Sequence, residues 1–162
     1  MTKSSSHDTG DGFTVYADGL AQSDSYLNMA SASIPNPNSV VWTTNAPTTD
    51  IFNVGTATGT NNSGKTYISY CRHSVSGYSK IGTYPGSGVS GKEVTLDFNP
   101  SFVLIKRINA TAGWVIVDDR RGTKELYPHL SNIEDTTTTS IVLGTNKFTL
   151  NSAGTRIVTG KQ

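Results

Sequence analysis

The sequence predicts an all-β fold, an antiparallel β-sandwich built from two related copies of one repeat unit, the first copy incomplete. Three observations predict it. Short stretches alternate apolar and polar residues with period two, turn-forming residues separate these stretches, and one set of motifs occurs twice in the same order. The nearest approach to a helical pattern, residues 123–133, contains Pro128 and allows at most one helical turn.

The expected strands are short and begin near the amino terminus. Period-two alternation marks residues 13–17, 66–71, 93–98 and 102–106. Turn signals separate them, because Gly and Asn accept positive φ and Pro presets φ. These signals lie at residues 18–19, 61–64, 85–88 and 99–100. Cys71 ends the apolar alternation of the second stretch, so we expect this lone cysteine to pack in the core.

Four blocks of the sequence recur in the same order about a hundred residues later. Residues 12–19 (GFTVYADG) are echoed by residues 113–122 (GWVIVDDRRG). The further pairs are 33–41 with 132–142, 52–54 with 148–150, and 64–68 with 154–158. Colinear blocks indicate a duplicated unit. We expect a first copy over residues 1–76 and a second over 77–162, with one merged β domain as the alternative.

Residues 79–107 have no counterpart upstream. If Met1 is the native start, the first copy lacks its opening strands and leaves an unpaired sheet edge. Such an edge must be covered to prevent unwanted pairing, and a neighbouring subunit could cover it by edge pairing or strand exchange.

The charge balance argues against several classes of partner. The 13 Lys and Arg residues against 12 Asp and Glu give a net charge of +1, so the chain has no basic field for nucleic acid or a membrane surface. No apolar run approaches the roughly 20 residues of a membrane helix, and no signal peptide is recognisable. We therefore expect a soluble protein without membrane insertion, made in the cytoplasm. Its single cysteine excludes an internal disulfide.

No residue pattern indicates catalysis, a metal or a cofactor. The densest charge cluster is Asp118-Asp119-Arg120-Arg121, with Glu125 nearby. Neighbouring residues on a strand point to opposite faces, so we interpret this cluster as a solvated turn with local ion pairs. The three histidines, His7, His73 and His129, lack metal-ligand spacing. The interpretation is a protein that is not an enzyme.

Aromatic residues are the candidate contacts with a glycan or a neighbouring subunit, because Tyr and Trp stack on sugar faces. The residues selected are Trp42, Tyr26 and Tyr127. Trp42 follows Val40 and Val41 but has no aromatic equivalent in the second copy, so we expect it to face an interface or a ligand. Phe13 and Trp114 share one repeat position and are expected in the core.

Residues 77–84 (GYSKIGTY), 98–107 (FNPSFVLIKR) and Gly113-Trp114 together resemble a domain of virion structural proteins. This domain recurs in tail fibres and other virion proteins of tailed bacteriophages, typically cyanophages. Residues 63–71 (SGKTYISYC) resemble its closing strand, so the similarity spans most of residues 12–158. The resemblance implies a β-rich module in tandem copies, without known catalysis, on the virion surface.

The leading expectation is a non-enzymatic virion structural protein made in the host cytoplasm, either a tail-fibre or adhesin segment or a capsid-decorating subunit. We expect it to form a homo-oligomer, with a trimer favoured, and to bind other virion proteins. The alternative is a carbohydrate-binding module that recognises host surface glycan. A glycan-degrading enzyme would need two carboxylates facing each other about 5 to 9 Å apart, and the sequence indicates no such pair.

Overall fold

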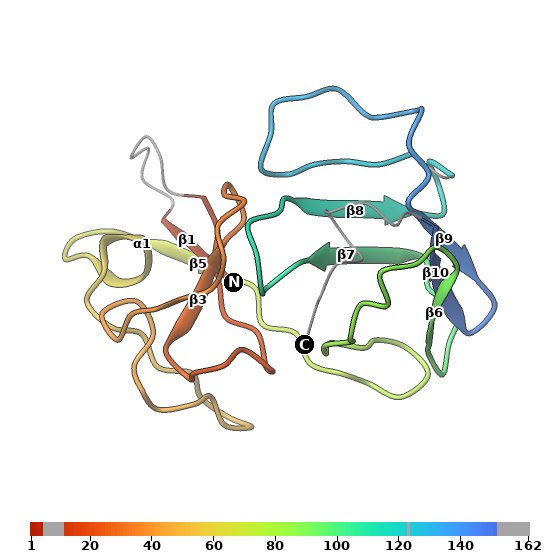
Figure 1. Cartoon of the computed structure of the whole chain (residues 1–162). Coiled ribbons are helices and arrows are strands. Elements are labelled where there is room, and N and C mark those ends of the chain that lie inside the picture. Colours follow the sequence, from red (N-terminus) through yellow and green to blue (C-terminus); the bar gives the residue numbers. More distant parts are fainter. Residues whose placement is uncertain (5–11, 123, 152–162) are drawn as a thin grey trace. The chain divides into compact units, whose positions relative to one another are not determined.

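The computed structural model describes residues 1–4, 12–122 and 124–151 (Figure 1). The chain divides into two compact units, residues 1–72 and 73–162, whereas the repeat pattern placed the boundary between residues 76 and 77. The predicted all-β class with antiparallel sheets is confirmed. The one helix among the described residues, α1 (Thr58–Asn61), is a single turn, and residues 124–133 hold none.

The first unit holds one antiparallel sheet in the order β4-β3-β2-β1-β5. Its strands are β1 (Thr2–Ser4), β2 (Thr14–Val15), β3 (Ser25–Asn28), β4 (Asn36–Pro37) and β5 (Tyr67–Ser69). The central registers pair Thr2 with Thr14 and Val15 with Leu27. Alternation on β3 buries Ser25 and Leu27 and leaves Tyr26 and Asn28 half-buried, as expected for a strand with one covered face.

The core of the first unit forms around Trp42, which is 4% exposed. The indole ring makes edge-to-face contacts with Tyr16 and Phe52, at centroid distances of 6.2 and 6.5 Å. An isolated antiparallel bridge joins Trp42 to Val54 and brings residues 40–42 and 52–54 together. Aromatic packing on one large side chain thus stabilises a unit whose strands are short.

The second unit holds two sheets, one in the order β6-β10-β9 and one that pairs β7 with β8. The strands are β6 (Lys92–Thr95), β7 (Phe102–Lys106), β8 (Trp114–Asp118), β9 (Ile141–Gly144) and β10 (Lys147–Leu150). Both sheets contribute to one apolar cluster. Its buried members are Val103, Ile105, Val115, Val117, Tyr127, Ile141, Phe148 and Leu150.

Local sequence explains these strands. On β7, Val103 and Ile105 are buried while their neighbours are not, which is the period-two pattern of a strand covered on one face. The β9–β10 hairpin turns at Asn146, whose φ of 54° lies in the left-handed region that Asn tolerates better than most residues. As predicted, Trp114 belongs to the core, with 4% exposure, whereas Phe13, which was expected there too, is only half-buried.

Successive segments pair in the same order in each unit. In the first, β1, β2, β3 and β4 are consecutive antiparallel neighbours. In the second, β7 pairs with β8, Ile116 of β8 bridges to Leu126, and Glu125 bridges to Asp135. Asn36 of β4 and Asp135 occupy one repeat position. This correspondence is what a duplication predicts, and the duplication and the sandwich arrangement remain predictions.

The predicted burial of Cys71 is wrong, because its thiol is exposed. Strand β5 ends at Ser69 and lies at the edge of its sheet, where Ile68 is exposed as well. Among the described residues, no apolar layer covers this end of the segment, and alternation alone did not reveal that.

Candidate functional site

The three aromatic residues selected from the sequence do not form one site. Trp42 and Tyr26 belong to the first unit and Tyr127 to the second. Trp42 is buried, so a sugar ring cannot stack on it in this conformation, and its Nε1 has no hydrogen-bond partner among the described residues. Tyr26 is half-buried on β3, opposite Asn36 of the edge strand β4. Tyr127 is 8% exposed and belongs to the core of its unit.

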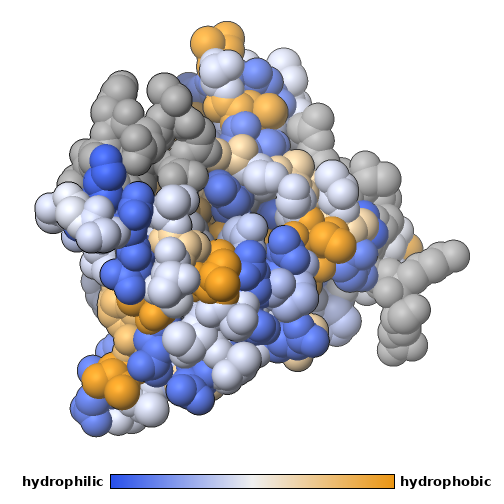
Figure 2. Space-filling model, turned by 90° about the vertical axis from the view of Figure 1, so that its left-hand side faces the viewer, coloured by the Kyte–Doolittle hydropathy of each residue, from blue (hydrophilic) through white to orange (hydrophobic). Residues whose placement is uncertain are grey.

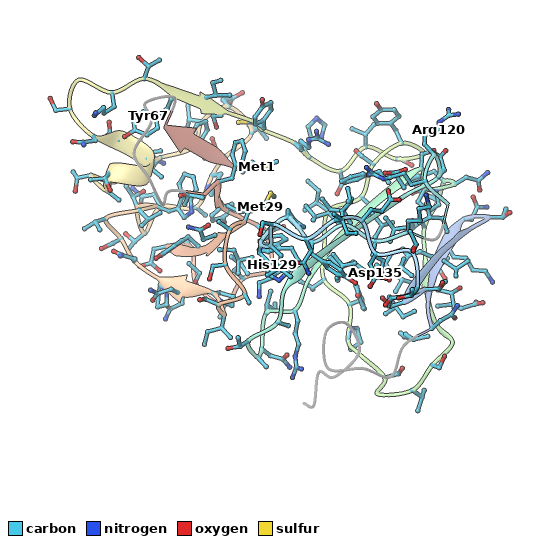
Figure 3. All side chains as sticks on the ribbon, turned by 90° about the horizontal axis from the view of Figure 1, so that it is seen from above. Met1, Met29, Tyr67, Arg120, His129 and Asp135 are labelled. Carbon is cyan, nitrogen blue, oxygen red and sulfur yellow. The ribbon has the colours of Figure 1, made fainter. Side chains whose placement is uncertain are left out.

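Tyr127 joins two carboxylates that the sequence did not indicate as a pair. Its hydroxyl donates to Glu125 Oε2 at 2.9 Å and lies 3.1 Å from Asp135 Oδ2. Burial, followed by these two carboxylates, raises the pKa of Tyr127 well above its usual range. Figure 3 shows Asp135 in the loop region that follows β8. The bridge between residues 125 and 135 brings these groups together, and the structure alone reveals this register.

Every carboxylate oxygen in this network is already engaged. Glu125, which is 1% exposed, accepts through Oε1 from both the amide, at 2.7 Å, and the hydroxyl of Ser140. Asp135 Oδ1 accepts from the amides of Thr137 and Thr138, and the Thr137 bond is the main cause of its lowered pKa. Because these oxygens already accept hydrogen bonds and Glu125 is shielded from solvent, we interpret the network as structural. It holds the segments around residues 125, 135 and 140 together.

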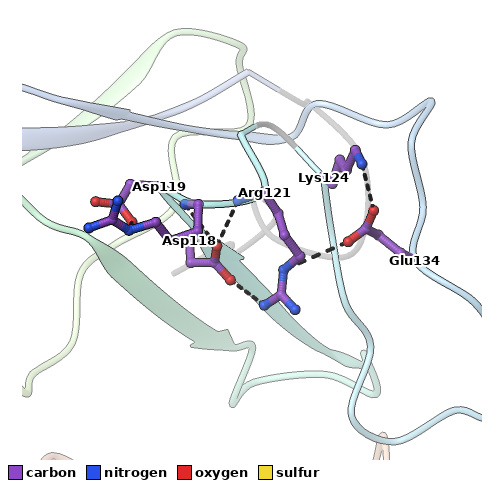
Figure 4. Close-up of polar contacts among 6 residues, drawn as sticks. Asp118, Asp119, Arg121, Lys124 and Glu134 are labelled. Atoms are coloured by element: carbon purple, nitrogen blue, oxygen red, sulfur yellow. Dashed lines mark hydrogen bonds and ion pairs between the residues drawn. The ribbon is translucent and has the colours of Figure 1, made fainter.

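The charge cluster after β8 is an exposed turn with local ion pairs, as predicted (Figure 4). The Asp118 carboxylate forms an ion pair with the Arg121 side chain and accepts a hydrogen bond of 2.9 Å from the Arg121 amide. The bond from that amide is the main cause of the lowered pKa of Asp118. Glu134 pairs with Lys124 at 3.0 Å and with Arg121 at 3.7 Å. Arg120 projects away from the ribbon (Figure 3), with its side chain 91% exposed. Solvated pairs of this kind contribute little to stability.

His129 has a structural role. Its Nδ1 accepts a hydrogen bond of 3.2 Å from the amide of Trp114, and its ring meets Tyr127 edge to face at 6.3 Å. The described residues contain no group of three or more His, Cys, Asp or Glu side chains that could hold a metal ion. His129 thus fixes the loop after residue 127 to β8.

A polar groove of about 320 Å³ lies in the second unit. It lies between the turn after residue 73 and the end of β6. Its lining combines four hydroxyls, an ammonium, a carboxylate and one apolar residue: Ser74, Ser76, Ser79, Thr95, Lys80, Asp97 and Leu96. Sequence reasoning assigned no function to these residues, because serines scattered in a turn carry no recognisable motif.

A network of hydrogen bonds shapes the turn beside this groove. Val75 and Ser79 exchange backbone hydrogen bonds of 2.9 Å across it, and Gly77 adopts a φ of 73° at the bend. Asp97 Oδ2 then accepts from Gly77 N at 2.9 Å and from Ser76 Oγ at 2.8 Å. The Gly77 bond is the largest cause of the lowered pKa of Asp97. Asp97 is therefore a carboxylate whose position is fixed by hydrogen bonds from Ser76 and Gly77 of the turn.

Tyr78 lies in the same turn and is 79% exposed. The groove hydroxyls include Ser74 and Ser79, whose side chains donate to the backbone carbonyls of Ile81 and His73. No histidine lines the groove to act as a base for a serine nucleophile. Hydroxyls, a carboxylate and a nearby exposed aromatic ring match the chemistry of polyol binding.

The family described as a domain of unknown function, DUF7483, matches residues 1–162. The chain belongs to this family. No curated protein and no solved structure matches the DUF7483 chain. In the part of the chain that the structure describes, no helix is long and apolar enough to cross a membrane.

Replacing Glu125 by Ala should strongly destabilise the second unit. The change leaves the amide and hydroxyl of Ser140 without their acceptor, while the Tyr127 hydroxyl keeps Asp135 Oδ2 at 3.1 Å. Buried groups left unpaired cost about 1 to 3 kcal/mol each, so we expect a loss of about 2 to 4 kcal/mol. Urea unfolding followed by tryptophan fluorescence measures this. Glu134→Ala, which removes the ion pairs of a half-buried carboxylate with the exposed side chains of Arg121 and Lys124, is the control and should cost less than about 1 kcal/mol. Equal losses in both variants would contradict the assignment.

Proposed function

We propose that this DUF7483 chain is a non-enzymatic structural protein of a bacteriophage virion that assembles into a homo-oligomer at the particle surface. Within the virion it would be a tail-fibre or adhesin segment or a capsid-decorating subunit, in contact with other virion proteins. The sequence resemblance to tail-fibre domains motivates the virion, and the surface of the described units supports assembly.

The observation that carries the proposal is the number of large apolar side chains at the surface. Ile133 is the most exposed, at 91%, and others are spread over both units. They include Ile34, Val40, Ile51, Phe52, Ile68, Val89, Phe102 and Leu130. Figure 2 shows such residues among hydrophilic ones on the face that it draws. With only 15% charged residues, the chain would assemble by apolar burial, at roughly 25 cal/mol per Å², and by backbone pairing.

Purified particles of the phage that encodes the chain test this proposal. We expect the protein in the particles at a constant copy number, low for a fibre and high for a capsid decoration, measured by quantitative gel analysis. Antibody labelling in electron micrographs should then place it on the tail or the capsid. Absence of the chain from purified particles, with abundant protein in the lysate, would contradict a virion role.

A second candidate function, carbohydrate binding, is favoured by the polar groove and the exposed ring of Tyr78. In this role, the Tyr78 ring would stack on a sugar face, and Asp97 and the groove hydroxyls would bind sugar hydroxyls. The ligand would be a host surface glycan. Binding by the groove would suit an adhesin segment of a fibre better than a capsid decoration.

A glycan array probed with the purified chain measures this second function. We expect Tyr78→Ala to lower the affinity of any bound glycan about five- to thirtyfold, as loss of a stacking contact worth about 1 to 2 kcal/mol implies. The matched control is Tyr70→Ala, which removes an exposed tyrosine of the first unit. An equal effect of both substitutions, or no glycan bound by the wild-type chain, would exclude the groove as a lectin site.

A further inference from the structure

We infer that a second copy of this chain pairs with residues 51–54 of the first unit, a segment outside strands β1–β5 that bridges to Trp42 at Val54, through the same four residues in a two-fold contact. This inference rests on the proposed function and deepens it, because it names the surface that assembles. It also replaces the trimer expected from the sequence by a dimer.

Residues 52–54 and the end of β10 share one repeat position but have different neighbours. Strand β10 has neighbours on both sides, because Phe148 lies opposite Leu143 of β9 and opposite Val94 of β6. In the first unit, Val54 bridges to Trp42 in the segment equivalent to β9. Thr48 engages the carbonyl of Ile51 at 2.9 Å and the amide of Ile51 at 3.2 Å in a turn. No other described residue pairs with residues 52–54 as a strand. The neighbour that is missing is the equivalent of β6.

The two segments also differ in how far their apolar side chains are buried. In the second unit, Phe148 is 7% exposed and Leu150 is fully buried. In the first unit, the equivalent Phe52 is 43% exposed, and Ile51 beside it is 59% exposed. One repeat position is thus core in one unit and surface in the other. Since exposed apolar residues on an unpaired edge favour pairing with another chain, residues 51–54 form a docking edge.

The composition of this edge favours a second copy of the same edge as its occupant. The sequence Ile-Phe-Asn-Val carries no charge, so antiparallel self-pairing places no like charges opposite one another. Ile51 stands where the second unit has Lys147, which forms an ion pair with Glu93 of β6. Ile51 cannot form the ion pair that Lys147 makes with Glu93, so this segment is less suited to a strand like β6.

Strand exchange is the weaker arrangement. For β6 of another copy to cover residues 51–54, that strand would have to leave its own β10 and expose Phe148 and Leu150. Exchange would uncover as much apolar surface as it covers. A two-fold contact between like edges covers both of them and closes the assembly at two copies.

The purified full chain tests the inference by sedimentation velocity over a range of concentrations. We expect a monomer–dimer equilibrium, and we expect Ile51→Lys to raise the dissociation constant about tenfold or more, because it places like charges on both edges. The fold should tolerate this change, since Lys occupies the equivalent position of β10. The control is Val89→Lys, an exposed apolar residue of the second unit, which should leave the equilibrium unchanged.

A covalent trap keeps the test decisive if Ile51→Lys fails to fold. In a Cys71→Ser background, Asn53→Cys should form a disulfide-linked dimer on mild oxidation, and Val89→Cys should not. A monomeric or trimeric wild-type chain, or equal trapping by both cysteines, would overturn the inference. This outcome is separate from the virion role. A chain found in particles but monomeric in solution would overturn the dimer and keep the virion role. A dimeric chain absent from particles would keep the dimer and overturn the virion role.

Discussion

The need to pair the edges of short strands is the constraint on which the rest of this structure depends. Strands such as β2 and β4 hold two residues each, so little of the sheet is stabilised by any one strand. Buried backbone groups must still be paired, because an unpaired amide or carbonyl away from water is costly. Each unit therefore adds a second device: the first packs aromatic rings around Trp42, and the second builds hydrogen bonds around the buried Glu125.

The two units meet this constraint to different degrees. In the second, β6 covers β10, and the equivalent apolar residues are enclosed. In the first, residues 52–54, which the predicted duplication places at the position of β10, bridge to Trp42 on one side, and Phe52 is exposed. A chain with few charges can use such a difference for assembly, because the uncovered edge offers both backbone groups and apolar area to a partner. The proposed structural role follows from this asymmetry, while the polar groove beside Asp97 is independent of it.

Sequence patterns predicted the fold class and several strands well, because alternation reports directly on side-chain direction. Residues 102–106 form β7 with the predicted limits, and Trp114 is in the core. The patterns failed where burial depends on residues distant in sequence. The environment of Trp42 is set by Tyr16 and Phe52, and Cys71 is exposed because no apolar side chain among the described residues covers the end of β5. The Glu125–Tyr127–Asp135 network needed the pairing register as well as the residue types.

Hydrogen exchange of backbone amides, measured by mass spectrometry on dilute and concentrated protein, tests the central claim most directly. If residues 51–54 form an edge that a second chain covers, their amides should exchange fast in dilute solution and slowly in concentrated solution. Amides of β10, which already has two neighbours, should exchange slowly at both concentrations. Equal exchange of residues 51–54 at both concentrations would contradict the account.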